Sequence, residues 1–88
     1  MSSILEELTE LIVQIISVPV GKDEIGIDTR LMDDLAMESI NLASLMFLCE
    51  DHFEIDVQSN TEVIPDLESV GDIVNFISEL KSDNKVTP

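Results

Sequence analysis

Three segments of this 88-residue chain carry apolar residues at helical spacing, and they leave little room for other regular structure. Residues 3–17, 39–53 and 69–81 each repeat apolar side chains three and four positions apart, which places these side chains on one face of a helix. Helices this short are marginal alone in water, so the apolar faces must pack against one another. The pattern predicts an all-α fold: a small up-down bundle of three main helices plus one short helix, with a long loop between the first two.

The starts of the first and last helices are marked by capping residues. Ser3 and Glu6 have the Ser-x-x-Glu spacing of a capping box, and Ser69 and Asp72 repeat this spacing with an aspartate. Gly71 follows in the first turn of the last helix, where glycine lowers helix stability.

The segment between the first two helices, residues 18–38, is long and contains Pro19, Gly21 and Gly26. Pro19 ends the first helix, because the residue before a proline avoids helical geometry. We expect a packed loop with one short helical turn, held to the core by its apolar side chains, which are Ile25, Ile27, Leu31, Met32 and Leu35.

The rest of the chain is connections and a tail. Residues 54–60 are mostly polar and are expected to be irregular. We expect one short helical turn at residues 61–64, which Pro65 ends. We expect residues 1–81 to form a single domain and residues 82–88 to form a flexible C-terminal tail.

The charge balance is strongly acidic, with nineteen acids and four bases giving a net charge of −15. No lysine or arginine lies between residues 31 and 80. Repulsion disfavours nucleic acid and anionic lipid as partners, whereas long-range attraction favours a basic protein partner. A large net charge also keeps a small protein soluble, so the charge by itself does not require a basic partner.

The compartment is predicted from cysteine usage and hydropathy. The single Cys49 lies in an apolar run and is interpreted as a small core residue in a reducing environment. No signal-peptide pattern is present, and the apolar run of residues 11–20 is too short to span a bilayer. We expect a cytoplasmic protein without membrane insertion.

Residues for catalysis or for metal binding are scarce. The only histidine, His52, sits among acids on a solvated face without a second base, and Cys49 has no cationic neighbour that would lower its pKa. The acidic clusters near residues 33–38 and 50–56 lack the alternating ligands and central glycine of an EF-hand loop. The sequence therefore predicts neither an enzyme nor a dedicated metal site.

Ser39 stands where the second helix begins. Its position alone is explained by helix capping. Two features favour a functional role. Glu38 is an unusual neighbour for a serine that only caps a helix, and the following helix is apolar on most of its surface. Between residues 40 and 49 only Asn41 and Ser44 are polar, so part of this helix is expected to be a docking face.

The segment Asp34-Leu35-Ala36-Met37-Glu38-Ser39-Ile40 resembles the Asp-Ser-Leu motif of the acyl carrier proteins, which Asp-Leu-Gly and one further residue usually precede. The resemblance extends from Ile4 to Leu80. It includes Leu31, the acidic-aromatic end of the second helix (Glu50, Asp51 and Phe53), and residues 67–73 at the start of the last helix.

The resemblance implies that Ser39 carries 4′-phosphopantetheine, attached from coenzyme A by a phosphopantetheinyl transferase that supplies the magnesium ion and the base. The thiol of this arm would carry acyl groups as thioesters. The other implied partners are acyl-transferring, condensing and modifying enzymes with basic docking patches, and the carrier is expected to be a monomer. The acyl chain can fold back among the helices in this family; the candidate lining residues, which are otherwise plain core, are Leu45, Cys49, Val57, Ile64 and Ile73.

Departures from the family pattern concern the recognition helix. Glu38, Ile40 and Ala36 conservatively replace the usual aspartate, leucine and glycine. Asn41 and Ser44 stand where carriers of bacterial fatty-acid synthesis usually have acids, which favours a specialised carrier for a polyketide or a dedicated lipid. The expected partner-binding residues are Asp34, Glu38, Ile40, Asn41, Ala43, Ser44, Met46, Phe47, Glu50 and Asp51.

Two alternatives stay open at this point. The first is a carrier of aminoacyl or peptidyl groups, which would use the same serine. The second is an acidic helical interaction module without a prosthetic group, which would use the apolar second helix as its binding surface.

Overall fold

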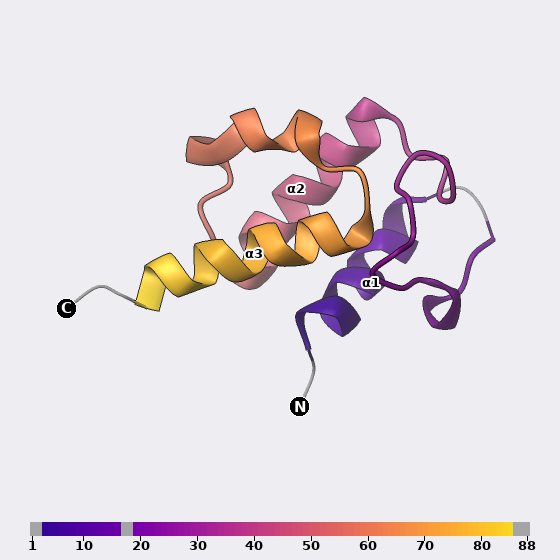
Figure 1. The fold of residues 1–88 in the computed structure, drawn as a ribbon, viewed down its shortest axis with the longest axis horizontal. Coiled ribbons are helices and arrows are strands. Elements are labelled where there is room, and N and C mark those ends of the chain that lie inside the picture. Colours follow the sequence, from indigo (N-terminus) through magenta and orange to yellow (C-terminus); the bar gives the residue numbers. More distant parts are fainter. Residues whose placement is uncertain (1–2, 17–18, 86–88) are drawn as a thin grey trace.

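The computed structural model describes residues 3–16 and 19–85. The elements follow in the order α1 (Ile4–Ile15), η1 (Lys22–Glu24), α2 (Ser39–Phe53), η2 (Gln58–Asp66) and α3 (Val70–Lys85), where η marks a 3₁₀ helix (Figure 1). The predicted all-α bundle with a long loop between its first two main helices is confirmed. Within the described ranges the extended pairing is limited to an isolated bridge between Arg30 and Ser69.

The helix starts follow the capping signals. At the start of α1, Ser3 Oγ accepts the N–H of Glu6 at 3.1 Å. Helix α1 ends at Ile15, earlier than expected, and residue 17 lies outside the described part. At α3, Ser69 Oγ accepts the N–H of Asp72 at 3.3 Å and Asp72 Oδ2 accepts the N–H of Ser69 at 3.2 Å. The capping box predicted there is therefore complete.

Two further predicted boundaries differ from the structure. Helix α3 continues to Lys85, beyond the expected end near Lys81. The short turn expected at residues 61–64 is part of the longer η2, which includes Pro65. Proline is tolerated because its fixed φ suits a 3₁₀ helix and it removes only its own N–H. The N–H of Leu67 still reaches the carbonyl oxygen of Ile64, at 3.1 Å.

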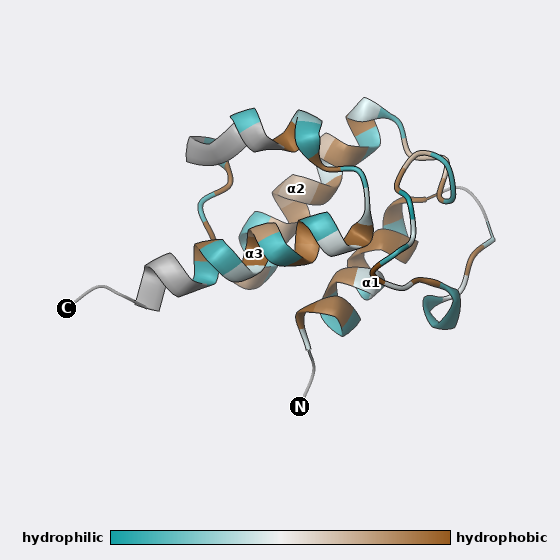
Figure 2. Ribbon diagram, viewed as in Figure 1, coloured by the Kyte–Doolittle hydropathy of each residue, from teal (hydrophilic) through white to brown (hydrophobic). Residues whose placement is uncertain are grey.

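The core lies between the three long helices, with α1 packed against both α2 and α3. Figure 2 shows hydrophobic residues along α1 and α2, whereas hydrophobic and hydrophilic residues alternate along α3. Glu7 Oε1 lies 2.8 Å from Nε2 of His52 and links α1 to the end of α2 at the surface. The helical side chains that are almost fully buried are Leu8, Ile12, Leu45, Met46, Cys49, Val70, Ile73 and Ile77.

The α1–α2 loop is held to the start of α3 by backbone hydrogen bonds. The N–H of Leu31 donates to the carbonyl oxygen of Glu68 at 3.0 Å. In the other direction, the N–H of Val70 donates to the carbonyl oxygen of Thr29, and the N–H of Gly71 donates to the carbonyl oxygen of Ile27, both at 2.9 Å. We call this set of bonds the loop strap.

The loop strap explains why part of the loop prediction is wrong. Ile25, Leu31 and Leu35 are buried as expected, but Ile27 and Met32 are 55% and 57% exposed. Backbone bonding at residues 27–31 fixes the course of the loop, so these two side chains are not needed to hold it against the core.

Candidate functional site

Ser39 is the first residue of α2, and Glu38 is the residue that precedes the helix with extended backbone angles. One hydrogen bond of a capping box is present here, because Asn41 Oδ1 accepts the N–H of Glu38 at 2.9 Å. Ser39 is exposed, and its hydroxyl has no hydrogen-bond partner among the described residues. The hydroxyl is therefore not used for capping and is accessible to another protein.

The surroundings of Ser39 favour an anion. The first intrahelical hydrogen bond runs from the N–H of Leu42 to the carbonyl of Glu38 at 3.0 Å, so the N–H groups of residues 39–41 lie at the positive end of the helix dipole. No acid lies in the first turn of α2. A phosphodiester on Ser39 would thus meet backbone donors and little repulsion from the helix itself.

The segment before Ser39 is rigidly held by burial that alternates along the chain. Leu35 and Met37 are 1% and 4% exposed, whereas Ala36 and Glu38 face solvent. Asp34 Oδ2 accepts the N–H of Arg30 at 2.8 Å, and the N–H of Met37 donates to the Leu31 carbonyl at 3.0 Å. These bonds place Ser39 at a fixed point on the surface.

Several side chains expected to bind partners lie on the exposed face of α2. Ile40 and Phe47 are 72% and 62% exposed, and Ala43, Ser44 and Asp51 are also exposed. This face therefore presents large apolar side chains to solvent.

Four of the other expected contact residues also have structural roles, whereas the Glu38 side chain is exposed. Met46 is only 2% exposed and belongs to the core. Glu50 Oε2 accepts the N–H groups of Val57 and Gln58, at 3.1 and 3.3 Å, and so joins the end of α2 to the start of η2. Asp34 and Asn41 are occupied by the bonds described above. Sequence reasoning missed these roles, because hydrogen bonding to local backbone leaves no periodic signal.

The residues predicted to line an acyl pocket are divided between two environments. Val57 and Ile64 lie at an apolar pocket of about 150 Å³ between α2 and η2. Leu45, Cys49 and Ile73 have no exposed surface and belong to the core. Burial raises the pKa of the Cys49 thiol to about 12, so this thiol is protonated and inert at neutral pH.

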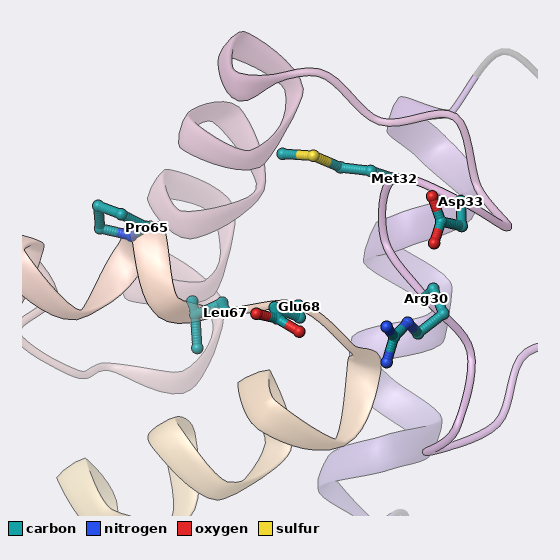
Figure 3. Close-up of a pocket in the computed structure, with 6 residues that line it drawn as sticks. All are labelled: Arg30, Met32, Asp33, Pro65, Leu67 and Glu68. Carbon is teal, nitrogen blue, oxygen red and sulfur yellow. The ribbon is translucent and has the colours of Figure 1, made fainter.

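A second, larger pocket lies where the α1–α2 loop approaches the connection between η2 and α3 (Figure 3). Its volume is about 320 Å³, and charged and apolar side chains line it together: Arg30, Met32, Asp33, Pro65, Leu67 and Glu68. This pocket was not predictable from the sequence, since its two walls are distant in the chain.

Residues 3–16 and 19–85 show neither a metal site nor a membrane-spanning helix. No group of three or more histidine, cysteine or acidic side chains in these ranges is arranged to hold a metal ion. None of the helices described has the length and hydropathy needed to cross a membrane.

Comparison with known proteins agrees with this geometry. The family model described as "Phosphopantetheine attachment site" matches residues 6–77. An acyl carrier protein of Borrelia garinii subsp. bavariensis is 36% identical over 78 residues, covering 86% of this chain and 95% of the relative. An acyl carrier protein of Rickettsia bellii is 32% identical over 79 residues, covering 88% of this chain and 95% of the relative. An acyl carrier protein of Campylobacter fetus is 25% identical over 79 residues, covering 90% of this chain and 97% of the relative.

The chain therefore belongs to the family of acyl carrier proteins that bear a phosphopantetheine attachment site. Its function is to carry acyl groups on this prosthetic group, and it is a carrier without catalysis of its own.

Proposed function

We propose that Ser39 is the attachment residue, and that the carrier serves fatty-acid, polyketide or specialised lipid synthesis. The observation that carries the proposal is the exposed Ser39 hydroxyl, which lies at the N-terminus of α2 and forms no competing hydrogen bond with the residues that the structure describes. Once attached, the arm supplies a terminal thiol that holds the acyl group as a thioester.

The loading step needs little from this chain. The Ser39 oxygen forms a bond to the phosphorus that bears the pantetheine arm of coenzyme A, and the pyrophosphate P–O bond breaks. The adenosine bisphosphate half leaves, and the serine proton passes to a base of the transferase. The chain contributes an exposed hydroxyl at a fixed position and a helix N-terminus that favours the resulting anion.

The proposed partners are a phosphopantetheinyl transferase and acyl-transferring, condensing and modifying enzymes with basic docking patches. Glu38 and Asp51 are exposed acids at opposite ends of α2, and the net charge of −15 supports long-range attraction to a basic surface. Between these acids, Ile40, Ala43 and Phe47 offer apolar contact area. A monomer in the cytoplasm is part of the proposal, supported by the free, buried thiol of Cys49.

The test is modification in vitro. Incubating the protein with coenzyme A and a broad-specificity phosphopantetheinyl transferase should add one phosphopantetheine, seen by intact mass spectrometry. Ser39→Ala should stay unmodified. Ser78→Ala, which removes an exposed hydroxyl from α3, should load normally. The proposal would be overturned if wild-type protein gained no mass with several transferases, or if Ser39→Ala still did.

An aminoacyl carrier would be loaded at the same serine and would differ only in its cargo. The mass of the thioester trapped on the arm in cells separates the two kinds of carrier: an amino acid in place of an acyl chain would overturn the acyl assignment.

A further inference from the structure

Arg30 is the residue at which the loop strap passes into a tight turn. Its backbone N–H donates to Asp34 Oδ2 at 2.8 Å, and its carbonyl oxygen accepts the N–H groups of Asp34 and Leu35 at 3.1 and 3.2 Å. The neighbouring residues Thr29 and Leu31 supply backbone groups to the strap. The backbone of Arg30 is therefore bonded to the turn, and the Asp34 carboxylate is the acceptor that its N–H needs.

The turn leads to Ser39 through bonded backbone. The N–H of Leu31 is bonded to Glu68 in the loop strap, and the carbonyl oxygen of Leu31 accepts the N–H of Met37 at 3.0 Å. Met37 lies two residues before Ser39. The first turn of α2 adds little restraint of its own, because Leu42 is the first buried residue of this helix. The position of the Ser39 hydroxyl therefore depends on the turn that precedes it.

The segment between the turn and Ser39 contains a strained residue. Ala36 has a φ of 55°, in the left-handed region that residues with a Cβ atom avoid. Such a conformation persists only where its neighbours hold it. On one side the Asp34 bond closes the turn, and on the other Met37 is 4% exposed and bonded to the loop. Loss of the Asp34 bond would let Ala36 relax and would displace the start of α2.

Asp33 and Asp34 allow charge and position to be separated. Both are exposed, and they are adjacent in the chain. Asp34 accepts the N–H of Arg30, whereas Asp33 lines the pocket of Figure 3 without a hydrogen bond to the residues that the structure describes. A docking acid acts through its charge, which both aspartates carry. Closing the turn requires an acceptor oxygen at position 34 alone.

We propose that Asp34 is a positioning residue for the loading reaction. Its carboxylate acts through the backbone of Arg30 and holds the Ser39 hydroxyl where a transferase can use it. The acceptor oxygen carries this role, and the negative charge does not. Displacement of a reacting group slows the chemical step, whereas loss of a docking charge weakens binding. This proposal rests on the attachment at Ser39 proposed above.

The experiment measures kcat and KM of a purified broad-specificity phosphopantetheinyl transferase, with the full chain as the varied substrate and coenzyme A at saturation. The variants are Asp34→Ala, Asp34→Asn and Asp34→Glu. Asparagine keeps a short acceptor without charge, whereas glutamate keeps the charge but moves the acceptor away by one methylene. Asp33→Ala and Asp33→Asn are the matched controls. Circular dichroism melts select a temperature at which every variant is folded, so unfolding does not contribute to the rates.

We expect Asp34→Ala to lower kcat by about tenfold or more with KM little changed, because a misplacement of about 1 Å can cost about 100-fold in rate. Asp34→Glu should also lower kcat, although it keeps the charge. Asp34→Asn and both Asp33 variants should keep kcat within about twofold of wild type, a change of less than about 0.5 kcal/mol in activation free energy.

Two results would overturn the positioning role while wild-type protein is still loaded. If Asp34→Asn raised KM as Asp34→Ala did, and Asp34→Glu kept the wild-type KM, then Asp34 would act as a docking charge. If Asp34→Ala lowered only the melting temperature and kept the wild-type kcat, then its bond would support the fold alone. Wild-type protein that no transferase loads would instead overturn the attachment at Ser39.

Discussion

At the residue scale, Ala36 shows why the family motif usually has glycine at this position. Its φ is 55°, in the left-handed region that disfavours residues with a Cβ atom. The next residue, Met37, is buried and bonded to Leu31, so the turn cannot relax without losing core contacts. The strain at Ala36 is therefore a feature of the approach to Ser39.

Ala36→Gly should relieve this strain and raise the free energy of unfolding by about 0.5–1 kcal/mol. Urea denaturation followed by circular dichroism measures the change. The matched control is Ala43→Gly within α2, which should lower the free energy of unfolding by about 0.5–1 kcal/mol. A destabilised Ala36→Gly would show that this backbone conformation is not strained.

Asp72 is the residue whose ionisation most clearly supports the fold. The N–H groups of Glu68 and Ser69 donate to its carboxylate at 3.0 and 3.2 Å, and these bonds hold the pKa of Asp72 below its ordinary value. The hydroxyl of Ser69 and the charge of Arg30 lower this pKa by smaller amounts.

Because the folded-state pKa of Asp72 lies below the unfolded-state value, its contribution to stability is complete above about pH 4. The contribution is lost as the pH falls through the lowered pKa. Asp72→Asn should therefore destabilise the protein by about 1 kcal/mol at neutral pH. The difference from wild type should shrink in acid, as measured by urea denaturation across this pH range. A difference that is independent of pH would contradict the role of the charged form.

At the scale of elements, the close contact between Gly71 and the α1–α2 loop reverses a sequence-based expectation. From helix propensity alone, Gly71 lowers the stability of α3. In the fold, a Cβ atom at this position would lie 2.9 Å from the carbonyl oxygen of Ile27. That oxygen accepts the N–H of Gly71, so the loop strap requires a residue without a side chain here.

Gly71→Ala should therefore destabilise the protein by about 1–3 kcal/mol, the usual cost of overpacking, although alanine favours helix. Gly26→Ala is the control in the same loop, since a Cβ atom there would meet no atom within 4 Å; it should be neutral or slightly stabilising. Thermal melting of both variants measures the contrast. A higher melting temperature for Gly71→Ala would contradict this account, because it would show that the loop can move to accommodate the added Cβ atom.

Some features of the helices and of the α1–α2 loop were predictable from the sequence, and others were not. The bounds of α2, the capping box at Ser69 and the position of Ser39 at a helix start were predictable, because hydrophobic period and capping residues are local signals. The exposure of Ile27 and Met32 was not, since it follows from backbone bonds to a segment about forty residues away. The bond from the N–H of Glu38 to Asn41 Oδ1 was not predictable either, and the expectation that Asn41 contacts partners stays a prediction.

At the scale of the whole molecule, four bases cannot neutralise nineteen acids. The surface ion pair between Lys22 and Glu10, at 3.7 Å, offsets little of the total because exposed pairs contribute weakly. Self-repulsion therefore works against the compact state.

Added salt or divalent cations should raise the melting temperature by screening this repulsion. Differential scanning calorimetry at several ionic strengths measures the effect. Sodium chloride and magnesium chloride compared at equal ionic strength separate screening from divalent binding. A melting temperature that does not move with either salt would show that the acids are too dispersed to destabilise the fold.

The exposed hydroxyl of Ser39 is the proposed attachment point of the carrier arm. The most direct test is the intact mass of the protein purified from its native host, followed by peptide mapping. We predict the mass of the chain plus one phosphopantetheine, with or without an acyl group, located on Ser39. A chain of unmodified mass, or an arm mapped to another residue, would contradict the account.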